Sequence, residues 1–361
     1  MAIYLRPAAF VDAPFGRDGQ VARLAGGLLW FSAYEVIRAE GGRRIAEQLV
    51  PVNGIDRFVD ALSPAEADMA RRTIARITAP RPPVMLGERV LRFDQPQVMG
   101  ILNITPDSFS DGGKNVDPVA AGVAMGEAGA AIVDVGGEST RPGAQPVWEG
   151  DEIARVRPVV AGLAKAGAIV SIDTRKAAVM EASLGQGAHI VNDVSALLWD
   201  PLSAPLLAGR DCPVVLMHHQ GDPQTMQERP TYGDVLIEVY DWLEARIAAA
   251  EAAGIARSRI IVDPGIGFGK SLRHNLALLN GLALFHGLGC PLLLGASRKR
   301  MIGALSNEAP VEKRLGGSVA LALHGAGLGA QIVRVHDVAE TVQALRVWRG
   351  MRDEALTPPI P

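Results

Sequence analysis

The stretch VMGILNITPDSFSDGG, residues 98–113, begins as a short apolar strand and continues into a polar loop that is rich in glycine and interrupted by proline. The same order then repeats: an apolar strand, a polar or glycine-rich loop, and an amphipathic helix, as at 232–254 and 311–327. The expected strands are 98–103, 130–136, 168–173, 189–194, 213–219, 259–265, 291–297 and 331–337.

Eight strand–helix units predict an α/β fold, a (β/α)8 TIM barrel. The strands of such a barrel are covered on both sides, which is why they are continuous apolar runs rather than alternating ones. A doubly wound open sheet is the alternative.

Composition limits the function classes. The chain has 361 residues, 48% of them hydrophobic, and a net charge of −3 without blocks of like charge. These features predict a globular protein that binds neither nucleic acid nor a membrane surface. The start MAIYLRPAAF has no leader pattern and no apolar run of about 18 residues occurs, so a cytoplasmic location is expected. Cys212 and Cys290 each precede a proline at the start of an apolar strand and are expected to be reduced core residues.

The first part of the chain differs in style, and we divide the sequence into an N-terminal extension of unknown role, 1–84, and a barrel, 85–361. Residues 63–77 predict a helix with a capping box, because Ser63 stands three residues before Glu66. Residues 78–84 are typical of a linker, and 87–96 predict a hairpin that closes the bottom of the barrel. The extension could be a structural cap, a dimer contact or a partner-binding module.

Three motifs resemble known sites but lack an essential feature. PGIGFGKS (264–271) has proline where a P-loop requires its first glycine, and GAGLGA (325–330) follows a helix instead of a strand. The adjacent pair His218 and His219 cannot reach one metal ion from a strand end, because neighbouring side chains point to opposite faces. We therefore expect one of these histidines in the site and the other packed elsewhere.

Polar residues stand at the end of every expected strand. In a barrel these ends lie on one face, where active sites form, although a single Asp or Asn there could equally be a helix N-cap. The residues are Asn103, Asp134, Asp173, Asn192 with Asp193, His218, Asp263, Ser297-Arg298-Lys299, and Arg334 with His336.

Three of these residues, Asp134, Asp173 and Asp263, allow two interpretations. They could bind a divalent metal cluster, or they could accept hydrogen bonds from a flat, nitrogen-rich ligand such as an aminopyrimidinone. A second group has the donors that an oligophosphate needs; it consists of Asn103, Thr140, Arg141, Arg334 and His336. Together the two groups suggest a heterocycle at the centre of the barrel and a phosphate-type leaving group at its rim.

The loops carry a specific resemblance. GILNITPDSFSDGG (100–113), DVGGESTRPGA (134–144) and LMHHQGDPQTMQ (216–227) resemble successive signatures of the dihydropteroate synthase family. The resemblance continues in order through SIDT (171–174), VNDV (191–194), DPGIGFGK (263–270), GASRKRMIG (295–303) and RVHDV (334–338). It covers residues 85 to 361 and implies a (β/α)8 barrel that joins 6-hydroxymethyl-7,8-dihydropterin diphosphate to 4-aminobenzoate. It also implies a sulfonamide target and a homodimer.

The resemblance also implies roles for individual residues. Asn103 would ligate Mg²⁺, and Lys299, Asp173, Arg334 and His336 would be the catalytic residues. The pterin would be held by Asp134, Asp173, Asn192, Met217, Asp263, Phe268 and Lys299. The diphosphate would be bound by Asn103, Thr140, Arg141, Arg334 and His336. The aminobenzoate would lie against Phe109, Pro142, Phe268, Ser297 and Lys299.

Two other functions are weighed against this one. A pterin-dependent methyltransferase would use the same barrel, but the chain has no Asp-x-His-x-x-Gly signature for cobalamin. A catalytically silent scaffold is disfavoured because every position expected to be essential is intact. One departure from the family is His219, at a position where an apolar residue is more usual.

Overall fold

The structure is a computed structural model that describes residues 2–104, 117–138, 146–221 and 230–358. Eight parallel strands pair in the order β12-β11-β10-β9-β8-β7-β14-β13. A parallel bridge between Val262 and Leu292 joins the two ends of this order, so the sheet closes. The predicted (β/α)8 barrel is confirmed, and the open sheet is not found. The strands are β7 (Gln97–Asn103), β8 (Ile132–Gly136), β9 (Val170–Asp173), β10 (Ile190–Asp193), β11 (Val214–Met217), β12 (Ile260–Asp263), β13 (Leu293–Leu294) and β14 (Ile332–Val335).

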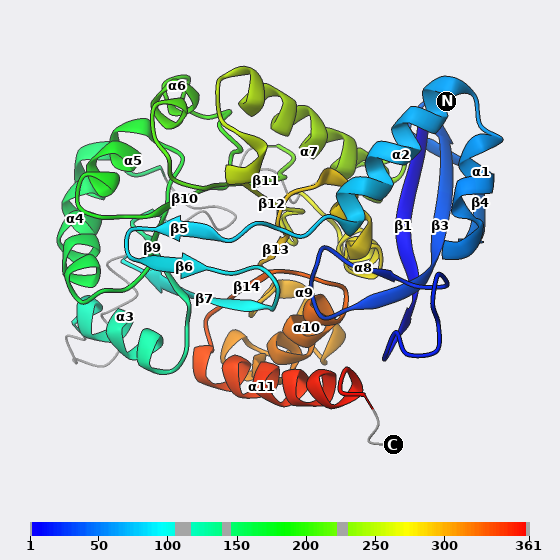
Figure 1. The fold of residues 1–361 in the computed structure, drawn as a ribbon. Helices are drawn as coiled ribbons and strands as arrows, with labels where there is room; N and C mark the ends of the chain where they lie inside the picture. The colour runs from blue at the N-terminus through cyan, green and yellow to red at the C-terminus, as the bar shows by residue number, and fades with distance from the viewer. Residues whose placement is uncertain (1, 105–116, 139–145, 222–229, 359–361) are drawn as a thin grey trace.

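Helices cover the outside of the barrel (Figure 1). Every residue of β8 to β12 is buried, because each strand contacts side chains inside the barrel and a helix outside it. The helices are α3 (Pro118–Glu127), α4 (Glu149–Lys165), α5 (Ala177–Leu184), α6 (Ser203–Ala208), α7 (Val235–Ala252), α8 (Leu272–Asn280), α9 (Arg300–Leu305), α10 (Leu315–Gly327) and α11 (Val338–Ala355).

The expected hairpin closes the bottom of the barrel. It begins earlier than predicted, with β5 (Val84–Leu86) inside the supposed linker, followed by β6 (Arg89–Leu91). Leu86, Leu91 and Phe93 are buried in one cluster with the inward-facing residues of the barrel strands. In Figure 1 the hairpin lies across the near end of the barrel, so the ends of the strands that carry the polar residues open on the far side.

The N-terminal extension forms an antiparallel sheet that sequence patterns did not predict. It contains β1 (Ala2–Val11), β2 (Ala22–Arg23), β3 (Trp30–Glu40) and β4 (Arg43–Pro51), with helices α1 (Ile55–Asp60) and α2 (Pro64–Thr78). The predicted capping box of α2 is present. Side chains such as Phe31 and Ile77 form a separate small core, whereas Tyr4, Ile37 and Ala39 pack into the main barrel core. The sheet therefore stands against the barrel wall (Figure 1).

The segment between extension and barrel is fixed to the barrel. Arg81 is 6% exposed and donates to the backbone carbonyls of Cys290, at 3.2 Å, and His286, at 3.1 Å.

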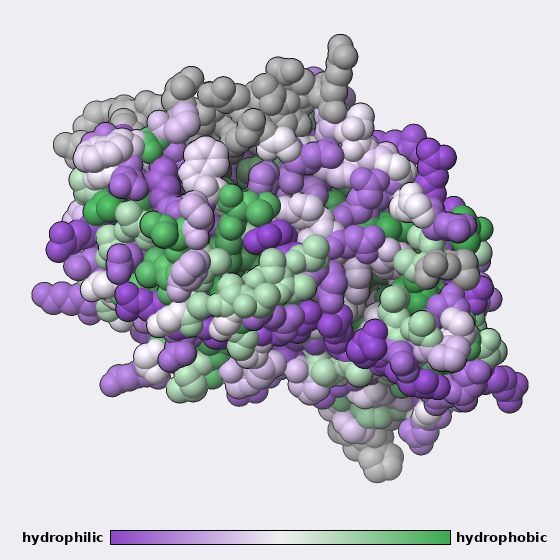
Figure 2. Space-filling view, turned by 90° about the horizontal axis from the view of Figure 1, so that it is seen from above, coloured by the Kyte–Doolittle hydropathy of each residue, from purple (hydrophilic) through white to green (hydrophobic). Residues whose placement is uncertain are grey.

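Both cysteines are free, as predicted; Cys290 is buried and Cys212 is partly buried. In the described residues no helix is long and apolar enough to cross a membrane. The face formed by α5, α6 and α7 mixes polar and apolar side chains (Figure 2).

Candidate active site

Four hydrogen-bonding side chains meet at the ends of neighbouring barrel strands. Asp134 lies in the middle of β8, Asp173 ends β9, Asn192 lies in β10 and Asp263 ends β12. All four are buried, with exposures of 0%, 6%, 4% and 5%, respectively. The Asn192 amide donates to Asp134 Oδ2 at 3.0 Å. The strand-end positions thus converge as predicted, on the face of the barrel opposite the hairpin.

Arg334 of β14 reaches across this group. Its Nε donates to Asp134 Oδ2 at 2.6 Å and one of its terminal nitrogens donates to Asp173 Oδ2 at 2.7 Å. Burial alone would lower the pKa of Arg334, but Asp134 and Asp173 outweigh it and the pKa is raised. The arginine assigned to the diphosphate group therefore contacts the carboxylates assigned to the heterocycle.

The second carboxylate oxygens of Asp134 and Asp173 make fewer hydrogen bonds than the first. Asp134 Oδ1 and Asp173 Oδ1 are buried and accept no hydrogen bond within the described part of the chain. Burial raises the pKa of Asp173 to about 7, with Arg334 opposing the shift and Asp134 adding to it. Burial also raises the pKa of Asp263, although the Gly265 N–H donates to it at 2.7 Å. Buried acceptors without donors are costly to leave unsatisfied, so the site favours a ligand whose edge presents N–H groups.

Asp193, next to Asn192, has a structural role instead. Its carboxylate accepts from Ser195 N and Oγ, each at 2.7 Å, and from Leu197 N at 2.9 Å. The side chains of adjacent strand residues point to opposite sides, which places Asn192 in the site and Asp193 behind it. At this position the N-cap-like interpretation of a strand-end Asp is the correct one.

The walls of the site come from the end of β11 and from the loops that follow β12, β13 and β14. Met217 is 4% exposed, and Lys299 Nζ lies 4.0 Å from the centre of the Phe268 ring. Ser297 Oγ is 3.1 Å from His336 Nδ1, so the ends of β13 and β14 are joined. Met217 is the register partner of Asp263 in the neighbouring strand, and Lys299 lies close enough to Asp263 to favour its charged form. The ligand-binding roles of Phe268, Ser297 and His336 stay predictions.

Two buried residues, Lys270 and His218, support the loop that carries Phe268. Lys270 Nζ is 2.8 Å from His218 Nδ1 and donates to the Phe268 carbonyl at 3.0 Å. Burial lowers the pKa of Lys270 to about 7, and burial with the nearby Lys270 lowers that of His218 to about 2. Gly265 is required here, since a Cβ would stand 1.8 Å from the His218 carbonyl oxygen. His218 is thus the buried member of the histidine pair, while His219 is partly exposed.

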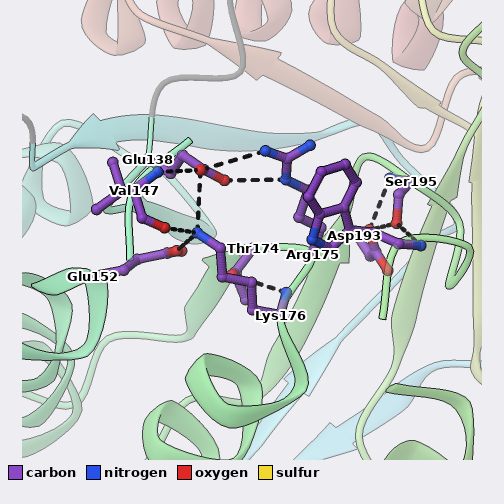
Figure 3. A network of polar contacts seen from close by, with 9 residues as sticks. Glu138, Val147, Glu152, Thr174, Arg175, Lys176, Asp193 and Ser195 are labelled. Carbon is purple, nitrogen blue, oxygen red and sulfur yellow. Dashed lines mark hydrogen bonds and ion pairs between the residues drawn. The ribbon is translucent and has the colours of Figure 1, made fainter. Parts of the chain in front are cut away.

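A second charged group lies at the rim (Figure 3). Lys176 Nζ contacts Glu138 at 3.1 Å and Glu152 at 2.6 Å, and it donates to the Val147 carbonyl at 2.7 Å. Arg175 donates to Glu138 at 3.1 Å, and its guanidinium carbon lies 3.6 Å from the centre of the Trp199 ring. Burial would raise the pKa of Glu138, but the Val147 N–H and Arg175 outweigh it and the pKa is lowered. The network joins the start of the third βα loop to both sides of the second.

Some predicted site residues lie outside the described residues: Phe109, Thr140, Arg141 and Pro142. Asn103 ends β7 and is partly exposed. Within the described ranges no three His, Cys, Asp or Glu side chains are grouped as ligands of a metal ion, which disfavours a metal cluster at the aspartates. Asn103 offers one neutral oxygen, which fits a Mg²⁺ ion that keeps most of its water and is carried by a phosphate ligand.

A family model described as "Pterin binding enzyme" matches residues 99–336, which include the strand ends just described. The chain belongs to this family. Within it, the chain is 51% identical to dihydropteroate synthase of Escherichia coli (strain K12) over 261 residues, 71% of this chain and 92% of the relative. The resemblance noted from the loops is thereby confirmed.

Solved structures of dihydropteroate synthases share the fold. The enzyme of Yersinia pestis, determined with a sulfonamide drug complex, is 45% identical with a TM-score of 0.72 and covers 75% of this chain and 100% of its own. The enzyme of Xanthomonas albilineans in complex with 7,8-dihydropteroate is 43% identical with a TM-score of 0.68, covering 75% of this chain and 99% of its own. These similarities identify this chain as a dihydropteroate synthase homologue, a pterinylmethyl transferase by family.

Sequence reasoning missed the rim network and the Lys270–His218 pair. Their residues stand within or beside motifs, but nothing in the spacing pairs Lys176 with Glu138 and Glu152, which lie in a different βα unit. Lys270 stands in the signature DPGIGFGK and His218 at a strand end, but nothing in the sequence pairs the two.

Proposed function

We propose that this protein condenses 6-hydroxymethyl-7,8-dihydropterin diphosphate with 4-aminobenzoate, forming 7,8-dihydropteroate and releasing diphosphate. The observation that carries this proposal is a pair of buried carboxylate oxygens on Asp134 and Asp173, beside Asn192, that accept no hydrogen bond from the described residues. A pterin edge presents the N–H donors that such acceptors lack. Asp263 would complete the edge, while Met217 and Phe268 would cover the ring faces.

The reaction requires stabilisation of the leaving group more than a strong base. Breaking the C–O bond to diphosphate leaves positive charge on the exocyclic methylene, which the electron-rich dihydropterin delocalises. The amine of 4-aminobenzoate then forms the new C–N bond and loses a proton. Lys299 and Ser297, next to Phe268, would orient the aminobenzoate, and exclusion of water prevents capture of the cation.

Arg334 would change partners during the cycle. Its two bonds to Asp134 and Asp173 occupy acceptors that the pterin needs. Once the pterin donors replace it there, the guanidinium can turn toward the diphosphate beside His336. Mg²⁺, held through Asn103 and diphosphate oxygens, would neutralise charge on the leaving group. Thr140 and Arg141 are proposed as further diphosphate contacts from the sequence.

A homodimer is also proposed. Leu305, Val311 and Leu315, around the junction of α9 and α10, are exposed large apolar side chains on neighbouring segments, as at protein interfaces. Sedimentation of the purified protein would measure this directly. A cytoplasmic location stays a prediction from the sequence.

The central experiment measures diphosphate release and pteroate formation by the purified protein, with both substrates and Mg²⁺. We expect coupled product formation that disappears in Lys299→Ala. Pterin binding without any pteroate would instead support the methyltransferase or scaffold alternatives.

A further inference from the structure

The N-terminal extension contacts several barrel elements, and one helix, α7, carries a row of its polar contacts. Three acidic residues of α7, at its N-cap and then two and three turns later, each pair with a different element of the extension. Asp234 binds Arg44 of β4, Asp241 accepts from the Tyr4 hydroxyl of β1 at 2.9 Å, and Glu244 binds Arg76 of α2 at 3.1 Å. The Tyr4 ring also packs edge-on against Tyr240, with 5.5 Å between centroids. The extension therefore fixes α7 along its length.

The Arg44 contact is placed at the start of α7. Asp234 is the N-cap: its Oδ1 accepts from Leu236 N at 3.0 Å and Ile237 N at 3.3 Å, while Oδ2 accepts from Arg44. The two residues keep 30% and 16% side-chain exposure, so the ion pair is partly screened from water. One carboxylate thus caps the helix and joins it to the extension.

From this N-cap the contacts lead into the candidate site. Tyr232, two residues earlier, donates its hydroxyl to the Gly269 carbonyl at 2.9 Å. Gly269 follows Phe268, and a Cβ at Gly269 would stand 2.3 Å from the Gln220 carbonyl oxygen, so this loop has little freedom to shift. Phe268 in turn lies against Lys299. Two steps of this series, from Asp234 to Tyr232 and from Gly269 to Phe268, follow the chain, and the others are non-covalent contacts.

We propose that the extension is a positioning element of the catalytic barrel, acting through Arg44 on Asp234 and through Tyr232 on the loop of Phe268. This inference rests on the proposed function, since the ring of Phe268 is taken as a wall of the pterin site. Arg44 touches no substrate and is a positioning residue. The extension is thereby a working part of the transferase, beyond a structural cap.

The test compares Arg44→Met and Asp234→Asn with a control, Arg71→Met. Asparagine still caps a helix, so Asp234→Asn removes the charge while keeping the N-cap. Arg71 also pairs with an aspartate, Asp60 at 2.8 Å, but both residues are exposed and belong to the extension. Arg44→Met and Asp234→Asn should each raise KM for the pterin diphosphate about three- to tenfold, with a smaller change in kcat. Arg71→Met should change neither.

Two further measurements separate positioning from simple stabilisation. Arg44→Lys should recover part of the lost affinity, and the double variant should be no worse than either single one. Hydrogen exchange of residues 264–270 should become faster in Arg44→Met and stay unchanged in Arg71→Met. A wild-type protein that makes no pteroate would refute the proposed function, whereas an active wild type with unchanged KM and exchange in Arg44→Met would refute the positioning role. A lower Tm without either change would refute it as well.

Discussion

The barrel contains two groups of buried acidic side chains, a central group at the strand ends and a rim group around the second βα loop. Positive charge compensates their carboxylates in different ways. At the centre, Asp134 and Asp173 share one arginine, and each keeps an oxygen that has no donor in the part of the chain that the structure describes. At the rim, both oxygens of Glu138 are bonded, by Arg175, Lys176 and the Val147 N–H. The pKa of Asp173 is raised by burial, whereas the donors around Glu138 lower its pKa in spite of burial. Glu152, the other rim carboxylate, also keeps one oxygen without a donor among the described residues, so the contrast lies in charge balance. Two cations serve the two rim carboxylates, whereas one arginine serves the two central ones, and this deficit of positive charge indicates where a ligand binds.

Neutralising the central group should have the largest effect on activity. We expect Asp173→Asn to lower kcat/KM by roughly 10³-fold, because a buried hydrogen-bonding site discriminates strongly when one partner is lost. The same change removes a poorly compensated buried charge, so the Tm should stay level or rise. Steady-state kinetics and thermal denaturation of the one variant test both parts. A large fall in Tm would mean that the central carboxylates are architectural, too.

Breaking the rim group should chiefly affect stability. Lys176→Met leaves Glu138 and Glu152 without their shared cation, which costs about 3–5 kcal/mol for a buried ion pair. A Tm lower by roughly 4–7 °C is therefore expected for a chain of this length. Lys165→Met, at the exposed end of α4, is the matched control and should leave the Tm unchanged. Glu138→Gln is a milder second variant; if both rim variants melt like the wild type, the rim network has no architectural role.

The smallest effect is expected in the pH dependence of stability and activity, which should reflect Asp173 of the central group. The pKa of Asp173 is raised by burial to about 7, above roughly 3.9 for an unfolded aspartate. The folded state therefore binds the extra proton, and the contribution of Asp173 to stability is lost as the pH rises from about 4 to about 7. Pterin binding uses the ionised acceptor, so kcat/KM should rise up to tenfold per pH unit until about pH 7. Both trends should be absent from Asp173→Asn; a variant that keeps the wild-type profile assigns the titration to another group.

The sequence predicted the barrel strands because each is a continuous apolar run, with boundaries within a few residues of the observed ones. The shortest strand, β13, has two residues where seven were expected, since Gly295 and the loop that follows leave the ladder early. The N-terminal sheet was not predicted. Pro7 interrupts the apolar pattern of β1, and β3 is buried on both faces, so neither strand shows simple alternation.

The positions of the candidate site residues could be predicted from the sequence as well as the barrel strands could, but their contacts could not. Strand topology places Asp134, Asp173, Asn192 and Asp263 together whatever their detailed contacts, so position in the strand was sufficient. Arg334 was grouped with phosphate ligands on its chemistry, but its long side chain reaches the carboxylates of strands that lie across the barrel. Ion pairs between separate units, such as Lys176 with Glu152, depend on packing and leave no periodic trace.

The barrel has one weakly paired seam, at the bridge that closes it. Five neighbouring strands, β7 to β11, are joined by continuous ladders and carry Asp134, Asp173 and Asn192. Between β12 and β13 there is one bridge, Val262 to Leu292, and a side chain, Gln331, substitutes for a backbone acceptor nearby. We expect local opening of the barrel to be easiest at this seam, beside the loops of Phe268 and Lys299, because it has the fewest backbone pairings. Asp134, Asp173 and Asn192 are thus carried by continuously paired strands, whereas Asp263 of β12 lies beside the single bridge.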